Sequence, residues 1–427
     1  MLRRFAQRGV GGAFRRLGRT RLFIFLAVMG PGLITAASDN DAGGVTTWSV
    51  AGSKYGYSLL WVLLLITPIL AVTQEMGARM GAVTGKGLAA LIRERFSMKL
   101  TAFAMLAMLI ANFGTSVAEF SGVAAAFGLA GVPAWTAVPP VALGVWLLVA
   151  RGSFRRVQSV FLFLTAVYLL YVFSGFLAHP DWKSAGLHTV VPTVQLNTAW
   201  FVTVIAAIGT TITPWGQFFI QAYVVDKHIS VKKYAYTRLE VFIGAIFTDG
   251  IDLFIVVACA ATLFAHGIVV NTAQDAARAL GPLAGRLASL LFGIGLLNVS
   301  ILGACILPLA TAYAFCEAFG LEASLDDSFS EAPAFHGLLG FFILAPAIVA
   351  VIPHLPLVKV ILLSQDVNGI LLPIILIFVL VIINDRRIMG DYVNNRTYNW
   401  VAWTFSGVLI ALSVVLVVSA LPFPFLK

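Results

Sequence analysis

The sequence is poor in charge, cysteine and histidine, and these shortages exclude several classes of protein. Only 11% of its 427 residues are charged and 60% are hydrophobic, whereas soluble domains carry about 25% charged residues. The three cysteines, Cys259, Cys305 and Cys316, lie in or beside apolar runs without the spacing of a disulfide framework or a metal site. The six histidines form no H-E-x-x-H motif. The composition therefore predicts an all-α polytopic membrane protein.

Eleven apolar runs are long enough to cross a bilayer as helices, which takes about 20 residues each. They cover residues 22–50, 57–83, 100–128, 133–150, 156–178, 197–225, 239–265, 285–316, 335–352, 357–383 and 400–423. The connections between them are expected to alternate between the two sides of the membrane.

The lysines and arginines predict which side is which. If the N-terminus is cytoplasmic, the inner segments hold 21 Lys and Arg and the outer segments hold six, as the positive-inside rule requires. The tail over residues 1–21 holds seven arginines and no signal-peptide core. We interpret the net charge of +9 as a topology signal of a cell-membrane protein with an extracellular C-terminus, and expect no nucleic-acid partner. Arg79 lies inside the second span, where Glu75 four residues earlier can pair with it.

Two carboxylates, an amide and two glycines interrupt the first span at residues 38–44 (SDNDAGG). A charged side chain at that depth costs several kcal/mol and usually faces a partner, a cavity or a substrate. Adjacent glycines also favour unwinding, which is tolerated in a membrane only where the backbone lines a buried or watery site. The stretch therefore predicts half of a cation site.

The sixth span is interrupted in the same way, by Gly209, Pro214 and Gly216 among hydroxyl and amide side chains. Proline removes a backbone hydrogen bond and frees carbonyl groups upstream. Broken helices five spans apart indicate an inverted repeat of five plus five helices, with the substrate at the midplane. We expect the repeats to cover residues 22–178 and 197–383, with the helix over 400–423 outside them. Ordinary kinks in packed helices are the alternative interpretation.

Several motifs resemble those of the Nramp metal-ion transporters. They are residues 30–32 (GPG) and 41–44 (DAGG) of the first helix, 74–85 (QEMGARMGAVTG) of the second, 117–122 (VAEFSG) of the third, 213–215 (TPW) of the sixth, where the family has Met-Pro-His, and 364–365 (SQ) of the tenth. The resemblance implies the LeuT-type fold and transport of divalent metal ions.

The departures from the family pattern concern the metal ligands. In the family, a first-helix Asp and Asn, a sixth-helix Met and a nearby carbonyl bind transition metals. Here Asp41 keeps the Asp, Gly44 replaces the Asn, Thr213 replaces the Met, and Thr210 would supply the carbonyl. Oxygen ligands without sulfur suit Mg²⁺, Ca²⁺ and Mn²⁺, and a roomier site suits Mg²⁺ that keeps several waters. The sequence thus resembles the Nramp-related magnesium transporters. The expected ligand set is Asp41, Asn40, Gly44, Thr210, Thr213, Gln217 and Gln365, with Mg²⁺, and also Mn²⁺, as transported substrate and no cofactor.

The resemblance also bears on coupling. The family links metal transport to protons through an Asp on helix three and histidines on helix six, and these positions are Ser116, Trp215 and Ile220 here. Proton relays need titratable groups. Glu119 remains without its expected neighbour. We expect uncoupled uptake by alternating access, driven by concentration and membrane potential.

Four other acidic residues lie at membrane depth. Asp39 either attracts cations from the outer vestibule or caps a helix segment. Asp249 and Asp252 share a face of the seventh span and either line the permeation path, bind a helper ion or have a buried, hydrogen-bonded structural role. Asp366 follows Gln365 and is a candidate for the cavity wall. Intramembrane carboxylates are functional hypotheses by default.

Three other functions remain as alternatives. A Na⁺-coupled amino-acid carrier of LeuT type would use the same broken helices, and a proton-coupled Mn²⁺/Fe²⁺ transporter of ordinary Nramp type would use the same motifs. An intramembrane aspartyl protease would pair Asp41 with Asp249 or Asp252, but no catalytic motif supports an enzyme. The expected partners are divalent metal ions and the lipid bilayer, with no obligate protein partner.

Overall fold

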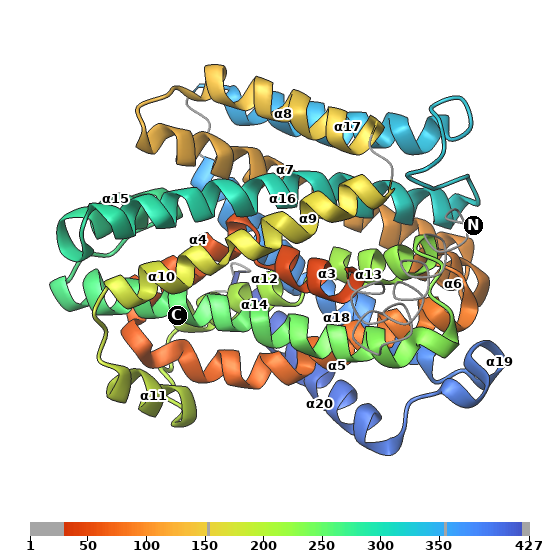
Figure 1. Cartoon of the computed structure of the whole chain (residues 1–427). Helices are drawn as coiled ribbons and strands as arrows, with labels where there is room; N and C mark the ends of the chain where they lie inside the picture. Colours follow the sequence, from red (N-terminus) through yellow and green to blue (C-terminus); the bar gives the residue numbers. More distant parts are fainter. Residues whose placement is uncertain (1–29, 152–153, 354–356, 421–427) are drawn as a thin grey trace, which may run out of the picture.

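The computed structural model describes residues 30–151, 154–353 and 357–420, and every regular element in these ranges is helical (Figure 1). The expected N-terminal tail and the start of the first span lie outside the described residues. The first half holds α3 (Pro31–Asp39), α4 (Ala42–Tyr55), η1 (Gly56–Leu59), α5 (Leu60–Thr84), α6 (Leu88–Arg95), α7 (Met98–Leu129), α8 (Ala134–Arg151), α9 (Phe154–Val167), α10 (Leu169–Leu177) and α11 (Trp182–Val190).

The second half continues in the same manner. It holds α12 (Thr198–Thr211), α13 (Pro214–Asp226), η2 (Val231–Lys233), α14 (Tyr234–Thr262), η3 (Phe264–His266), α15 (Ala273–Ala284), α16 (Arg286–Phe319), α17 (Pro333–Val351), α18 (Leu357–Ile383), α19 (Arg386–Met389), η4 (Gly390–Tyr392) and α20 (Arg396–Ala420). The short helices α6, α11 and α15 lie between expected spans and were not predicted from the sequence.

Nine helical stretches within the described ranges are long and apolar enough to cross a membrane. One of them, Ala42–Thr84, joins α4 and α5 through η1, so it contains parts of two expected spans. The last expected span is helical as α20 but is not among the nine. The connections α6 and α19, expected on the inner side, lie at one end of the molecule, and α11 and α15 lie at the other (Figure 1).

Both predicted helix breaks are confirmed. The first helix is interrupted at Asn40 and Asp41, between α3 and α4. The sixth is interrupted at Ile212 and Thr213, between α12 and α13. Each second half begins with a residue that caps a helix N-terminus well, and Pro214 takes the first-turn position where its missing N–H costs nothing.

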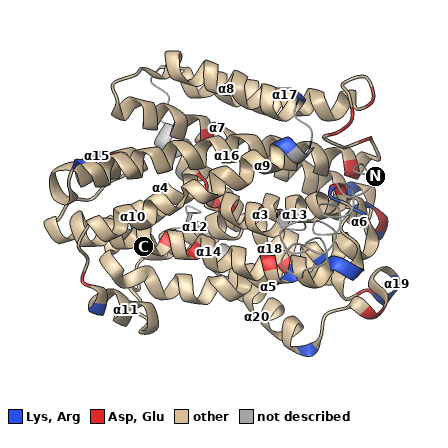
Figure 2. Ribbon diagram, in the orientation of Figure 1, with Lys and Arg blue, Asp and Glu red and all other residues tan. Residues whose placement is uncertain are grey.

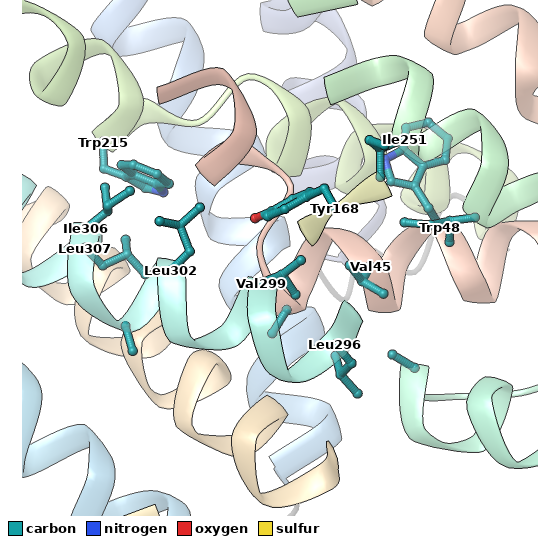
Figure 3. Packing of buried hydrophobic residues seen from close by; sticks show 14 of the residues in the cluster. Val45, Trp48, Tyr168, Trp215, Ile251, Leu296, Val299, Leu302, Ile306 and Leu307 are labelled. Carbon is teal, nitrogen blue, oxygen red and sulfur yellow. The ribbon is translucent and has the colours of Figure 1, made fainter. Parts of the chain in front are cut away.

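The core packs around α16, which lies against α7, α15, α17 and α13. Figure 3 shows Leu302, Ile306 and Leu307 of α16 beside Trp215, with Tyr168 beside the break of the first helix. Because lipid tails are as apolar as these side chains, close packing and polar contacts hold such helices together, rather than water exclusion. A Cβ built on Gly32 would lie 2.8 Å from the backbone nitrogen of Val241, so glycine is what lets α3 approach α14.

Charged residues are distributed unevenly over the bundle. In Figure 2, Lys and Arg gather mainly in connections and at helix ends, whereas several acidic residues lie inside, near α4 and α14. The predicted pair in the second span forms, with Arg79 Nη2 3.3 Å from Glu75 Oε2. Arg79 also donates to the carbonyl groups of Tyr392 and Val393, so this base ties α5 to the segment after α19.

Candidate cation site

Asp41 lies at the first helix break, where one of its oxygens caps α4 and its carboxyl group also faces that of Glu119. It is fully buried, and its Oδ1 accepts a hydrogen bond from the backbone N–H of Gly44 at 2.7 Å, which caps α4. Its Oδ2 and both side-chain polar atoms of Asn40 are buried without a hydrogen-bond partner among the described residues. Buried polar groups are nearly always paired. These open oxygens are therefore candidate cation ligands.

Gly44 and Gly43 leave room for other polar atoms beside this position. A Cβ built on Gly44 would lie 3.1 Å from Thr210 Oγ1 and 3.3 Å from Asn40 Oδ1. A Cβ on Gly43 would overlap the amide nitrogen of Gln365 and lie 3.0 Å from Asp41 Oδ1. The side-chain polar atoms of Thr210 and Gln365 also have no partner within the described ranges. The structure thus gathers these side chains around two glycines, from α3–α4, α12 and α18.

Two expected ligands are placed differently. The Thr213 hydroxyl accepts a hydrogen bond from Gly216 N–H at 3.1 Å and donates to Asp39 Oδ1 at 2.6 Å, so it is engaged by the protein. Gln217 is buried on α13 with both amide atoms unpaired among the residues described, but no contact places it against Gly43 or Gly44. Asp39, which also accepts from Gln74 Nε2 at 2.7 Å, joins α3 to α13 and α5.

Glu119 of α7 adds a second carboxyl group at the start of α4. Its Oε2 accepts from Ala42 N–H at 3.3 Å, and a Cβ on Gly303 would lie 2.5 Å from that oxygen, so glycine leaves room for it. A helix N-terminus carries a partial positive charge that stabilises carboxylates. Two carboxyl groups, Asp41 and Glu119, therefore share one helix end inside the bundle.

The positions linked by resemblance to proton coupling hold no titratable group. Ser116 is fully buried. Trp215 packs against α16 (Figure 3), and the Ile220 side chain lies where a Cβ on Gly77 would touch it, at 2.7 Å. All three therefore fill space in the core.

The remaining acidic residues lie around the site. Asp249 and Asp252 are buried on α14, beside Thr67 and Trp48 respectively. Asp366 follows Gln365 on α18, so its side chain points about 100° away around the helix, and it is only partly buried. No three His, Cys, Asp or Glu side chains within the described ranges form a metal centre. A cation at Asp41 must therefore use amide, hydroxyl or carbonyl oxygens as well.

Two residues that the sequence did not predict hold the first broken helix, one at the start of α3 and one at the break. Glu240 of α14 accepts hydrogen bonds from the backbone N–H groups of Gly30 and Leu33, and so caps α3. Tyr168, between α9 and α10, donates to the carbonyl of Asn40 at 3.1 Å. Glu240 could have been singled out from the sequence, because it is an acidic residue in an apolar span. Nothing in the sequence distinguishes Tyr168.

Two helices broken beside one buried carboxylate, with half-helix ends meeting there, define a membrane transporter of the broken-helix class. The comparison with family models is more specific. Residues 32–419 match the model of the natural resistance-associated macrophage protein-like family, Nramp, and the chain belongs to this family.

Relatives and solved structures agree with this assignment. A divalent metal cation transporter MntH of Deinococcus radiodurans is 29% identical over 409 residues, covering 91% of this chain and 88% of the relative. Another MntH, from Ralstonia nicotianae, is 31% identical over 402 residues, covering 90% and 89%. The crystal structure of the Eremococcus coleocola manganese transporter with a bound bis-isothiourea compound matches with a TM-score of 0.76 at 21% identity, covering 94% of this chain and 88% of that one.

More distant structures share the fold. Mhp1, a nucleobase-cation-symport-1 family transporter, matches in its closed conformation with a TM-score of 0.56 at 13% identity, over 91% of this chain and 90% of its own. The protein therefore has the LeuT-type fold that the helix breaks predicted.

Proposed function

We propose that this protein transports divalent metal cations across the cell membrane by alternating access, with Asp41 as the central ligand. One observation carries the proposal: Asn40 Oδ1 and Thr210 Oγ1 lie beside the gap left by Gly44, three residues after Asp41, and both atoms are buried without a hydrogen-bond partner within the described residues. The relatives named as divalent metal cation transporters support it. The proposed orientation has a cytoplasmic N-terminus and an extracellular C-terminus.

Manganese is the ion best supported. The structural neighbour from Eremococcus coleocola is a manganese transporter, and the relatives are described as divalent metal cation transporters without a named ion, so the expectation of magnesium specificity has no support from the comparisons. Magnesium stays as a second candidate because of the donor set alone. Carboxylate, amide and hydroxyl oxygens suit both Mg²⁺ and Mn²⁺. Thr213 replaces the methionine of the family pattern, so this position supplies no sulfur ligand.

The comparisons do not support uncoupled transport either, and they fit a proton-coupled transporter of ordinary Nramp type better. Glu119 favours coupling, because its carboxyl group lies at the same helix end as Asp41. Ser116, Trp215 and Ile220 favour passive uptake, because none can carry a proton. A divalent cation moving inward without protons would gain about 4.6 kcal/mol per 100 mV, twice the value for one charge.

The test uses purified protein in liposomes that contain a Mn²⁺- or Mg²⁺-sensitive dye, with a pH-sensitive dye in parallel. We expect Mn²⁺ uptake that is lost in Asp41→Ala and unchanged in Asp391→Ala, whose side chain is exposed in η4. Acidification of the lumen together with Mn²⁺ would establish coupling, and uptake that follows a K⁺ diffusion potential without acidification would establish passive transport. Uptake of Mg²⁺ as well would show that Mg²⁺ is a second transported ion. No metal uptake by the wild-type protein would overturn the proposal.

A further inference from the structure

We propose that the side chain of Asp39 is a positioning group that joins the two helix breaks, and that its carboxylate does not bind the transported cation. The inference rests on the proposed cation transport. Asp39 and Asp41 are two residues apart, and both are buried. Their surroundings differ. Asp41 Oδ2 accepts no hydrogen bond from a donor group within the described residues, whereas each oxygen of Asp39 already accepts a hydrogen bond from the protein.

The contacts of Asp39 form a continuous chain across the site. Gln74 of α5 donates to its Oδ2 at 2.7 Å, and Thr213 donates to its Oδ1 at 2.6 Å. The same Thr213 hydroxyl accepts from Gly216 N–H at 3.1 Å and thereby caps α13. A hydroxyl has one proton to donate, so Asp39 determines where the Thr213 proton points. The carboxylate thus connects the end of α3 to the start of α13.

Gly216 packs tightly against the contact between Asp39 and Thr213, which is called the joint below. A Cβ at that position would lie 2.7 Å from Thr213 Oγ1 and 2.8 Å from Asp39 Oδ1. Both distances are too short for a carbon atom, so only glycine leaves the joint intact. Asp39, Thr213 and Gly216 therefore pack together where the two helix breaks meet.

The joint has a consequence for transport. The helices α3 and α13 are the halves of the two broken helices that lie on the side proposed to be cytoplasmic. In alternating access, such halves move as part of rigid bodies around the substrate site. Asp39 links both halves to each other and to α5, so they are expected to move together. Loss of the link should reduce the maximal transport rate more than the affinity for the cation.

The amide of Gln74 allows the charge of Asp39 to be removed without loss of its hydrogen bonds, through Asp39→Asn. Its Oε1 has no hydrogen-bond partner among the described residues, so the amide can turn over and accept from a new donor. In Asp39→Asn, the side-chain oxygen can still accept from Thr213 while the new NH₂ group donates to Gln74. This variant removes the charge and keeps the joint. Asp39→Ala removes both.

The experiment measures Mn²⁺ uptake kinetics in liposomes and Mn²⁺ binding by calorimetry for both variants, with Asp391→Asn as an exposed control. Asp39→Asn should keep affinity and maximal rate within about threefold, whereas Asp39→Ala should lower the rate about tenfold with little change in affinity, as expected for lost hydrogen bonds to a charged group. If Asp39→Asn weakens Mn²⁺ binding as strongly as Asp41→Asn does, Asp39 is a ligand and the inference is wrong.

A second measurement does not depend on transport. Thr213→Val removes the same hydrogen bond from the other side, so the losses in thermal stability of Asp39→Ala and Thr213→Val should not add in the double variant. Additive losses would overturn the inference even if uptake is confirmed. Absence of uptake in the wild-type protein would overturn the proposed function and leave the stability cycle as the test of the joint.

Discussion

The two halves of the first broken helix both pack closely against α14, but they differ in how their ends are held. The inner half, α3, is fixed at its ends by polar side chains. Glu240 accepts from the N–H groups of Gly30 and Leu33 at the start, and Thr248 donates to the carbonyl of Ala36 at 2.5 Å near the end. These two side chains are eight residues apart on α14, about 12 Å at 1.5 Å per residue, which matches the length of α3.

The outer half, α4, is fixed mainly by packing. Val45 and Trp48 are fully buried in one apolar cluster, Val45 near Val299 of α16 and Trp48 beside Ile251 of α14 (Figure 3). The hydroxyls of Thr46 and Ser49 bond to carbonyls of α4 itself, so they do not tie it to its neighbours. At Gly52 the helix lies directly against the backbone of α14.

This difference indicates which half can move. Apolar packing consists of many weak contacts that are lost together only when helices separate. A few directional hydrogen bonds at helix ends can be exchanged one by one for water. We therefore expect α3 to leave α14 during transport while α4 stays in place, and we expect substitutions in the two halves to have different effects.

The largest effect on movement is expected from Glu240→Ala. It leaves the N–H groups at the start of α3 without a cap, and loss of such a cap costs about 1–2 kcal/mol. Since 1.4 kcal/mol is about a factor of ten, the population with α3 released should rise about tenfold. The measurement is the labelling rate of Ser38→Cys, buried in α3, by a water-soluble maleimide.

Glu240→Gln is the matched control, because its amide oxygen can still accept from the backbone. It should label at a rate between the wild-type protein and Glu240→Ala. The native cysteines Cys259, Cys305 and Cys316 are buried, so they give little background. Equal labelling of all three proteins would show that the polar contacts at the start of α3 do not control its release.

Gly52→Ala tests the outer half and should affect stability instead. The new Cβ would lie 2.8 Å from the carbonyl oxygen of Val256 and 2.9 Å from Cys259 Cβ. Because one of these atoms is backbone, α4 and α14 must separate slightly, and overpacking of this kind costs about 1–3 kcal/mol. We expect a lower melting temperature in a thermal-shift assay, with unchanged labelling of Ser38→Cys.

The control for this substitution is Gly144→Ala in α8, where a Cβ would meet nothing within 4 Å. That variant should be as stable as the wild-type protein or slightly more stable, since alanine favours helix. Faster labelling in Gly52→Ala would contradict the comparison, because it would mean that α4 also governs the release of α3.

The comparison also shows what the sequence can and cannot predict. Both breaks were predictable, because Asp41 with two glycines and Pro214 between two glycines are local signals in otherwise apolar helices. The residues that hold the two broken helices in place were not predictable. Glu240 lies about 200 residues from α3, and only the fold brings it there. Thr213 was expected to face the cation from its position in the motif, but its hydroxyl points to Asp39, a contact that depends on how α3 and α13 meet.

The smallest effect is expected from Thr248→Val, which removes a single hydrogen bond at the other end of α3. The carbonyl of Ala36 lies in the last turn, where helix carbonyls have no partner within the helix, and a hydrogen bond to one is worth about 1 kcal/mol. Labelling of Ser38→Cys should therefore rise about fivefold, with a loss of stability no larger than this one hydrogen bond explains, because valine fills nearly the same space. Thr248→Ser, which keeps the hydroxyl, should label like the wild-type protein. If Thr248→Val instead lowers stability without changing the labelling rate, then α3 is held by packing as α4 is, and the two halves do not differ in the way proposed.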